Sequence, residues 1–252
     1  ILCRAYGVPT KPSNTTFKNL DDRVILKHEE IPIIADKKKH PASWVLSIDP
    51  AGSKSWFMLL VGVSANGTHY VTKEWPDSSY GEWADLDRGD KPGGVPGDAS
   101  KANGYGIAEY AEVIREMVRD VSTEEILGGS DNLDIIIDPR MGNASYLKSE
   151  GTSTIVADLQ EHGINVYPAE GLQAINTLLS YDTDKPLDGL NHPKLYFSDQ
   201  CGNTIFCCMN YRVDDGLKAP CKDPTDCLRY VAIGNYEYYE DASLEITGTG
   251  GY

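Results

Sequence analysis

The sequence of 252 residues is long enough for one large domain or two small ones, and its hydrophobic residues, 40% of the chain, can form a substantial core. Its 38 acidic and 23 basic residues give a net charge of −15, which argues against a nucleic-acid binder with a broad basic face. No apolar run approaches the length of a membrane span, and no signal-peptide pattern is present, so we expect no membrane partner.

The six cysteines include no CxxC pair and no disulfide-framework spacing, and the five histidines are scattered. A structural zinc site is therefore not expected. We expect reduced thiols and a cytoplasmic protein.

Residues 1–40 are interrupted by glycine and proline and are expected to form a linker or edge segment, with one domain over residues 41–252. Two short β-like pieces, residues 23–26 and residues 31–34, are expected to pack on the edge of that domain.

The stretch from Trp44 to Gly52 is a short apolar run that ends in Asp49 and a proline, which predicts a buried strand with an acid at its end. Strand signals recur over residues 56–63 and 69–75, and the Asn-Gly pair between them predicts a hairpin. Ribonuclease H-like nucleases begin with three such strands. Actin-like ATPases and sugar kinases begin in the same way, so this pattern leaves both classes open.

Residues 76–104 are acidic, rich in turn residues and without apolar periodicity, which predicts a long loop that is functional or mobile. Apolar residues at helical spacing, beginning with Ile107 and Tyr110, then predict a helix over residues 106–121.

The pattern Ile-Asp-Pro appears a second time at residues 137–139, at the end of an apolar run that begins at Leu133. This recurrence is the strongest internal signal in the sequence. The elements predicted after it are helices over residues 152–162, 172–181, 202–211 and 224–233 and strands over residues 164–168 and 194–198. The tail from residue 235 is expected to be loosely held.

Three acids, Asp49, Asp138 and Asp226, stand at the ends of predicted elements. If the two Asp-Pro strands are neighbours, Asp49 and Asp138 emerge side by side, and a C-terminal helix packed on the sheet delivers Asp226 from its first turn. Converging carboxylates repel one another unless a cation neutralises them, and oxygen ligands select magnesium or manganese. An Asp before Pro is by itself often only a turn residue. It is the combination of the three acids that indicates a site for two ions, about 4 Å apart, suited to phosphodiester hydrolysis.

The chain resembles the C-terminal nuclease domain of the large terminase subunit of tailed phages, the DNA-packaging motor. Residues 47–52 and 137–141 resemble the two acidic motifs of that family, and residues 226–230 resemble its late motif, an acid followed by a small residue, Leu, Arg and Tyr. Residues 4–8 and 195–205 supply further matches, so the resemblance spans most of the chain.

The resemblance implies an α/β fold, a ribonuclease H-like mixed sheet flanked by helices. It implies a Mg²⁺- or Mn²⁺-dependent endonuclease that cuts concatemeric viral DNA at headful or site-specific ends. By position, Asp49, Asp138 and Asp226 are the implied metal ligands, and Asp223 is a plausible fourth. Glu109 stands roughly where true ribonucleases H place a glutamate, a ligand that terminases generally lack.

Three basic residues, Lys54, Arg140 and Lys222, are candidate contacts to DNA phosphates. The implied partners are double-stranded DNA, an ATPase domain before residues 1–40, the portal and a small terminase subunit. The implied location is the host cell cytoplasm rather than the mature virion. In residues 52–55 no glycine directly precedes Lys54, and the first glycine of a phosphate-binding loop is missing, so this chain alone is not expected to hydrolyse ATP.

Two other interpretations stay open. One is another ribonuclease H-like enzyme, such as a junction resolvase or a transposase, although these are normally more basic. The other is a non-catalytic ribonuclease H-like module that docks on a portal or capsid.

Overall fold

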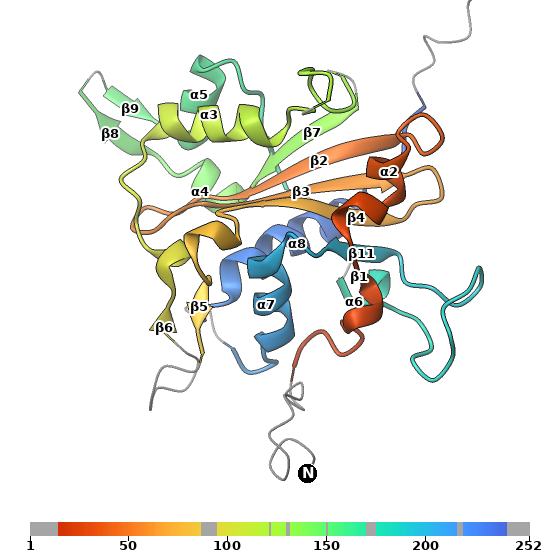
Figure 1. The fold of residues 1–252 in the computed structure, drawn as a ribbon. Helices are drawn as coiled ribbons and strands as arrows, with labels where there is room; N and C mark the ends of the chain where they lie inside the picture. Colours follow the sequence, from red (N-terminus) through yellow and green to blue (C-terminus); the bar gives the residue numbers. More distant parts are fainter. Residues whose placement is uncertain are drawn as a thin grey trace, which may run out of the picture.

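A mixed seven-stranded sheet forms the centre of the protein and separates two layers of helices (Figure 1). The computed structural model describes residues 15–86, 95–120, 122–129, 132–149, 151–169, 175–215 and 219–240. The strands of the sheet are β1 (Ile25–Leu26), β2 (Ala42–Asp49), β3 (Phe57–Ser64), β4 (His69–Trp75), β7 (Leu133–Ile137), β10 (Tyr167–Pro168) and β11 (Leu195–Ser198). They lie in the order β1-β11-β4-β3-β2-β7-β10.

The helices and the minor strands lie around this sheet. The α-helices are α2 (Pro32–Ala35), α3 (Ile107–Met117), α4 (Pro139–Gly142), α5 (Ile155–Glu161), α6 (Ile175–Leu178), α7 (Gly202–Asn210) and α8 (Lys222–Gly234). Short 3₁₀ helices span Asp22–Val24, His28–Glu30, Ser78–Tyr80 and Asp98–Ser100. Two separate antiparallel pairs join β5 (Ala84–Asp85) to β6 (Val95–Pro96) and β8 (Tyr146–Lys148) to β9 (Gly151–Ser153).

The sheet is antiparallel at its centre and parallel at both edges. Strands β2, β3 and β4 form an antiparallel meander, β7 pairs parallel with β2, and β11 pairs parallel with β4. Helices α3 and α5 cover one face, and α6, α7 and α8 cover the other (Figure 1). The predicted mixed α/β architecture is therefore confirmed.

The continuous apolar runs of β2 and β3 follow from the covering of both faces. Val45 and Phe57 point into the core beneath α8, whereas Trp44 and Met58 point into the core beneath α3. The predicted hairpin between β3 and β4 is confirmed: Gly67 has a φ of 74°, and the Asn66 side chain accepts a hydrogen bond from the backbone of Thr68 at 3.1 Å.

The N-terminal segment differs in part from its prediction. Residues 25–26 form the edge strand β1, but residues 31–34 belong largely to the helix α2 and not to a strand. Pro32 occupies the first turn of this helix, where its missing N–H costs nothing, and Ile33 is buried against the sheet. The division of the chain at residue 40 stays a prediction.

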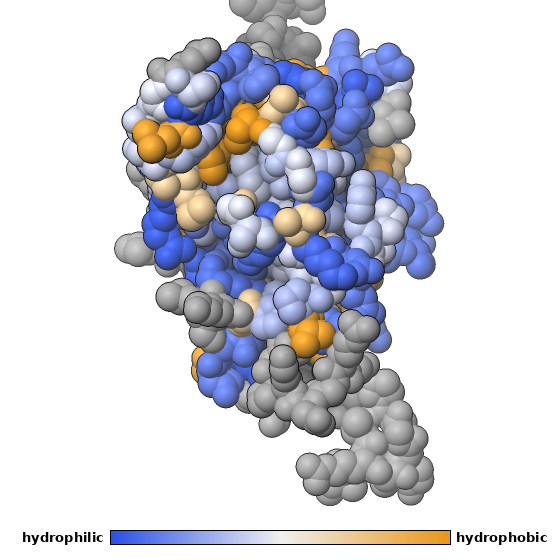
Figure 2. Space-filling view, turned by 90° about the vertical axis from the view of Figure 1, so that its left-hand side faces the viewer, coloured by the Kyte–Doolittle hydropathy of each residue, from blue (hydrophilic) through white to orange (hydrophobic). Residues whose placement is uncertain are grey.

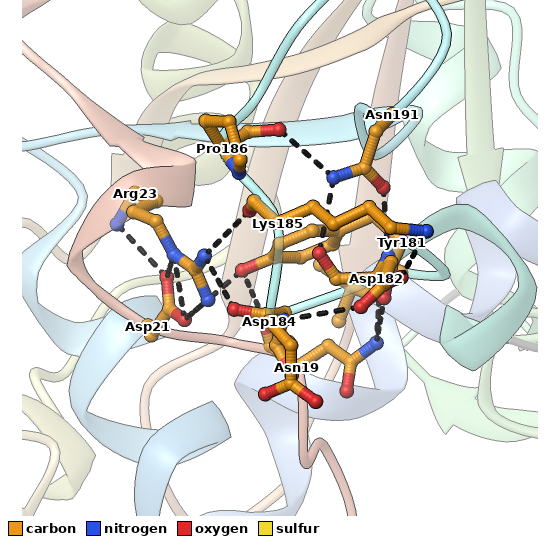
Figure 3. Close-up of polar contacts among 11 residues, drawn as sticks. Asn19, Asp21, Arg23, Tyr181, Asp182, Asp184, Lys185, Pro186 and Asn191 are labelled. Atoms are coloured by element: carbon orange, nitrogen blue, oxygen red, sulfur yellow. Dashed lines mark hydrogen bonds and ion pairs between the residues drawn. The ribbon is translucent and has the colours of Figure 1, made fainter.

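Polar contacts hold the described part of this segment against the loop that follows α6 (Figure 3). Arg23 pairs with Asp21 at 2.7 Å and donates to the carbonyl of Thr183 at 2.9 Å. The hydroxyl of Tyr181 donates to Asp21 at 3.0 Å, and the amide of Asn19 donates to the carbonyl of Leu179 at 3.1 Å. Residues far apart in the sequence thus close one edge of the sheet together.

The described residues of the segment 76–104 are more ordered than their composition suggests. Trp83 is fully buried, with its ring 5.0 Å from that of Phe57 in an edge-to-face arrangement, and its backbone N–H donates to Asn203 at 2.9 Å. A Cβ on Gly97 would lie 1.7 Å from the carbonyl oxygen of Glu82, so only glycine fits there. The described part of the insert is therefore anchored in the core, although residues 87–94 lie outside the described ranges.

Three predicted elements have other boundaries in the structure. The helix predicted over 152–162 begins at Ile155, capped by Thr154, because residues 151–153 pair with β8. The last helix begins at Lys222 rather than Pro224. The predicted strand over 164–168 reduces to the two residues of β10.

Other predictions concern the thiols and the tail. The five cysteines among the described residues are buried and free, as expected, while Cys3 lies outside the described ranges. The backbone of Tyr239 donates to Ser43 at 2.9 Å, so the start of the tail contacts β2, while residues 241–252 also lie outside. Within the described ranges, no helix combines the length and apolarity needed to cross a membrane.

Glu74 is a buried carboxylate on β4 that binds the first turn of α7. It accepts hydrogen bonds from the backbone of Asn203 at 2.8 Å and from the backbone and hydroxyl of Thr204, each at 2.7 Å. Burial nevertheless dominates and raises the pKa of Glu74 from 4.5 to about 7.

We expect this group to make the stability of the protein depend on pH. The folded chain binds the proton more tightly than the unfolded chain, so the stabilisation is fully present below pH 4.5 and is lost as pH rises through about 7. Urea unfolding gives the free energy of unfolding of the wild type and of Glu74→Gln. The value for the wild type minus the value for the variant is expected to be larger at pH 5.5 than at pH 8, by about 2 kcal/mol. A difference that is equal at the two pH values would contradict the assignment.

Candidate functional site

Asp49 and Asp138 lie side by side at one end of the sheet, as expected for the case that the two Asp-Pro strands are neighbours. Strands β2 and β7 run parallel with Ile48 opposite Ile137, and the backbone N–H of Asp138 donates to the carbonyl of Ile48 at 3.0 Å. Both acids are almost entirely buried, at 7% and 2% exposure. Asp138 also caps α4, because its carboxylate accepts the backbone N–H of Arg140 at 2.8 Å.

Helix α8 packs across β2 and β3, on the face of the sheet opposite α3 (Figure 1), and two further acids lie in its first two turns. The thiol of Cys227 donates to the carbonyl of Phe57 at 3.3 Å, and Phe57 is the partner of Asp49 in the sheet. Because α8 begins two residues earlier than predicted, Asp223 occupies its first turn and Asp226 lies in the second. The prediction of a C-terminal helix on the sheet is confirmed, but the prediction that Asp226 stands in its first turn is wrong.

The electrostatic neighbours of Asp49 identify the acids that face it. Burial, together with the charges of Asp223 and Asp138, raises the pKa of Asp49 from 3.8 to about 7, although Lys222 and Lys54 oppose the rise. At neutral pH the site thus holds a carboxyl group whose ionised form is poorly compensated by the chain itself.

The three basic residues predicted to contact phosphates each pair with one of these acids. Lys54 pairs with Asp223, Lys222 pairs with Asp226, and Arg140 lies 3.4 Å from the carboxylate of Asp138. In the structure these basic side chains partly neutralise a cluster of acids.

Asp223 acts directly on Asp49, whereas Asp226 and Glu109 have other partners. Asp226 is buried between two cations, Lys222 and Arg229, the latter at 3.0 Å. Glu109 lies on α3, across the sheet from α8, and its carboxylate accepts the backbone N–H of Gly106 at 2.9 Å, which caps its own helix. The structure does not bring Glu109 into the cluster.

Tyr230 is the last residue of the late motif, and its place among the acids of this site was not predicted. Its hydroxyl is buried and makes no well-formed hydrogen bond within the described residues. Burial raises its pKa, and the charges of Asp49 and Asp138 raise it further. The signal was its spacing, since Tyr230 follows Asp223 by seven residues, or two helical turns, and so lies on the same face of α8.

The residues present fit a hard divalent cation. Asp138 after β7 and Asp223 on α8, the acids that act on Asp49, supply carboxylate oxygens, which magnesium and manganese prefer, and the buried hydroxyl of Tyr230 belongs to the same site. In the part of the chain that the structure describes, however, no three acid, histidine or cysteine side chains converge closely enough to hold one metal ion as they stand. The lysines lie between the acids instead.

Seen from this end of the sheet, the surface is mainly hydrophilic (Figure 2). Hydrophobic side chains gather in its upper part, on the side of α3 and the β8–β9 pair (Figure 2).

The sequence matches no protein-family model and no curated protein. Solved structures of the large terminase from a thermophilic bacteriophage are similar in fold. One in crystal form 3 is 17% identical, with a TM-score of 0.50 over 86% of this chain and 44% of that chain. A complex of the same terminase with ATP-gamma-S is 17% identical, with a TM-score of 0.51 over 90% of this chain and 46% of that chain.

The chain thus shares its fold with a portion of a large terminase and spans less than half the length of that protein. The resemblance inferred from the sequence motifs is confirmed at the level of the fold. The match at residues 4–8 lies outside the described ranges.

Proposed function

We propose that this chain is a Mg²⁺- or Mn²⁺-dependent DNA endonuclease that cuts concatemeric viral DNA during genome packaging. The observation that supports the proposal is the buried carboxyl group of Asp49, on which the charges of Asp138, just after β7, and Asp223, on α8, both act and which the protein leaves poorly compensated. The fold shared with a large terminase supports the packaging context.

Asp49, Asp138 and Asp223 would hold the cation, and Asp226 stays a predicted ligand that Lys222 and Arg229 bind in the metal-free chain. When bound, two divalent ions would lower the pKa of a water molecule and stabilise the leaving oxygen.

The protein's own residues would position the DNA for this reaction. Lys54 and Arg140 stand at the edge of the acids, where each can pair with a phosphate oxygen once the charge of its acid is neutralised. In the hydrolysis, the oxygen of water bonds to phosphorus, one phosphorus–oxygen bond to the sugar breaks, and the leaving oxygen takes up a proton.

In the complete protein we propose double-stranded DNA, an ATPase domain, the portal and a small terminase subunit as partners, in the host cell cytoplasm. The similar phage terminase was also solved with ADP and with ATP-gamma-S. In residues 52–55 no glycine directly precedes Lys54, and the first glycine of a phosphate-binding loop is missing, so we do not assign nucleotide hydrolysis to this chain. A junction resolvase, a transposase or a non-catalytic docking module are the alternatives.

A plasmid-nicking assay tests the proposal. The purified chain is incubated with supercoiled plasmid in Mg²⁺, in Mn²⁺ and in EDTA, and open-circle and linear products are followed on gels. Products that require the metal support the endonuclease. No cleavage at any metal concentration would favour the docking module, and selective cutting of four-way junctions would favour a resolvase.

A further inference from the structure

A cavity of about 450 Å³ lies directly beside the acidic cluster, and the activity proposed above does not account for it. Its walls come from the turn after β2, the segment before α3 and the segment after α4, including Lys54, Tyr105 and Tyr146. Its volume lies within the range of about 300–1,000 Å³ that is usual for small-molecule sites. We propose that this cavity receives one unstacked nucleobase of the DNA strand that is cut; the inference rests on the proposed function.

Several residues that line the cavity follow Asp49 or Asp138 closely in the sequence. Ala51 and Gly52 line it and follow Asp49 by two and three residues, and Met141 lines it and follows Asp138 by three. Lys54 lines the cavity and also pairs with Asp223. A nucleotide whose phosphate reaches the acids therefore has its base within reach of this cavity.

Aromatic rings provide a surface on which a base can stack. Trp56 and Tyr110 form the floor; both are buried and stack with ring centroids 4.0 Å apart and planes within 4°. Tyr105 lies beside them, its ring 5.6 Å from that of Tyr110, and is 39% exposed. Tyr105 and the cation Lys54 both line this cavity, and exposed aromatic rings together with cations are the groups with which proteins hold unpaired bases.

One polar group is oriented to recognise the edge of a base. The side-chain oxygen of Asn103 accepts hydrogen bonds from the backbone of Tyr105 at 3.1 Å and from the hydroxyl of Tyr110 at 3.2 Å. Its amide nitrogen is then the group left to donate to an acceptor, such as a carbonyl oxygen or ring nitrogen of a base.

The cavity is fixed by contacts that do not depend on a ligand. The backbone and the hydroxyl of Ser55 both donate to the carbonyl of Lys101, at 3.1 and 2.8 Å, which ties the wall before α3 to the start of β3. Glu109 caps the same wall at Gly106. Because the walls are already ordered, binding a base costs little further conformational entropy.

The test uses binding without cleavage, so that it does not depend on activity. A single-stranded oligonucleotide carrying 2-aminopurine is titrated with the chain in Ca²⁺, and both the quenching of its fluorescence and its anisotropy are recorded. Tyr105→Ala is expected to weaken binding by about fivefold or more and to reduce quenching, since stacking on this ring is lost. Ala144→Phe, which fills the cavity from an exposed wall position, is expected to do the same.

Tyr167→Ala is the matched control, because Tyr167 is 57% exposed on β10 and does not line the cavity; it is expected to bind as the wild type does. Equal binding and quenching by all four proteins would overturn the inference, as would a wild type that does not quench the probe. Plasmid nicking with the same preparations separates the two claims. If quenching depends on Tyr105 but the chain never nicks DNA, the endonuclease proposal is wrong and the proposal of a base-binding cavity still holds.

Discussion

Replacing Asp49 by asparagine is expected to lower metal-dependent plasmid nicking by about 10³-fold or more, because asparagine keeps the shape of the side chain and removes its charge. Asp49 is the acid that both Asp223 and Asp138 face, so its loss removes the centre of the proposed metal site. The fold is expected to persist. In metal-free buffer at pH 8, the free energy of unfolding should not fall, since the substitution removes a charge that burial and two neighbouring acids disfavour.

Asp134→Asn is the matched control for this experiment. Asp134 lies on β7, the strand that leads to Asp138, but near the opposite end and paired with Val45 in the register. It is expected to nick plasmid at the wild-type rate. If Asp49→Asn stayed within a few fold of the wild type while remaining folded, the acids would not be the metal site.

Replacing Trp83 by alanine is expected to lower the free energy of unfolding by about 3–5 kcal/mol, the cost of removing a fully buried large aromatic side chain. The ring packs on Phe57, the sheet partner of Asp49, and Lys54 lies with its Nζ 6.0 Å from the ring centroid. Urea unfolding followed by circular dichroism measures the loss.

Tyr80→Ala provides the comparison within the same insert. Tyr80 is 51% exposed, and its removal is expected to change the free energy of unfolding by only about 0.5 kcal/mol. Equal and small effects of the two substitutions would mean that the insert is not anchored in the core. A large effect of Trp83→Ala alone would show that part of this acidic loop stabilises the domain.

The strands of the sheet were predictable because their apolar runs are buried on both faces and end in turn residues. Strand β4 agrees with its prediction at both ends, and β7 ends at the residue before Asp138 as expected. The segment at residues 31–34 was not predictable as a helix, since four residues cannot show a helical period; its proline and its burial against the sheet decide its conformation.

The burial of Trp83, in the segment 76–104, could not be predicted from the local sequence. A single tryptophan in a polar loop carries no periodicity, so its burial beneath the sheet depends on contacts with Phe57 and Asn203 that are far away in the sequence. Long-range contacts of this kind override local composition.

The side-by-side placement of Asp49 and Asp138 followed from the sequence only if the two Asp-Pro strands were neighbours, and the pairing of β2 with β7 confirms that they are. The pairing of Lys54 with Asp223 could not, since it depends on where α8 begins and how it crosses the sheet. The metal-ligand roles of Asp49, Asp138, Asp223 and Asp226 stay predictions. The resemblance to a large terminase supplied the function, whereas the residues alone had left the ATPase and sugar-kinase interpretations open.

The central claim is that acids distant in the sequence meet around divalent cations, and crystals of the chain soaked in Mn²⁺ test it most directly. We expect anomalous difference peaks within bonding distance of the Asp49 carboxylate, shared with Asp138 and the acids of α8, with the lysines displaced. Fully ordered crystals with no peak beside Asp49, or with manganese bound only elsewhere, would contradict it.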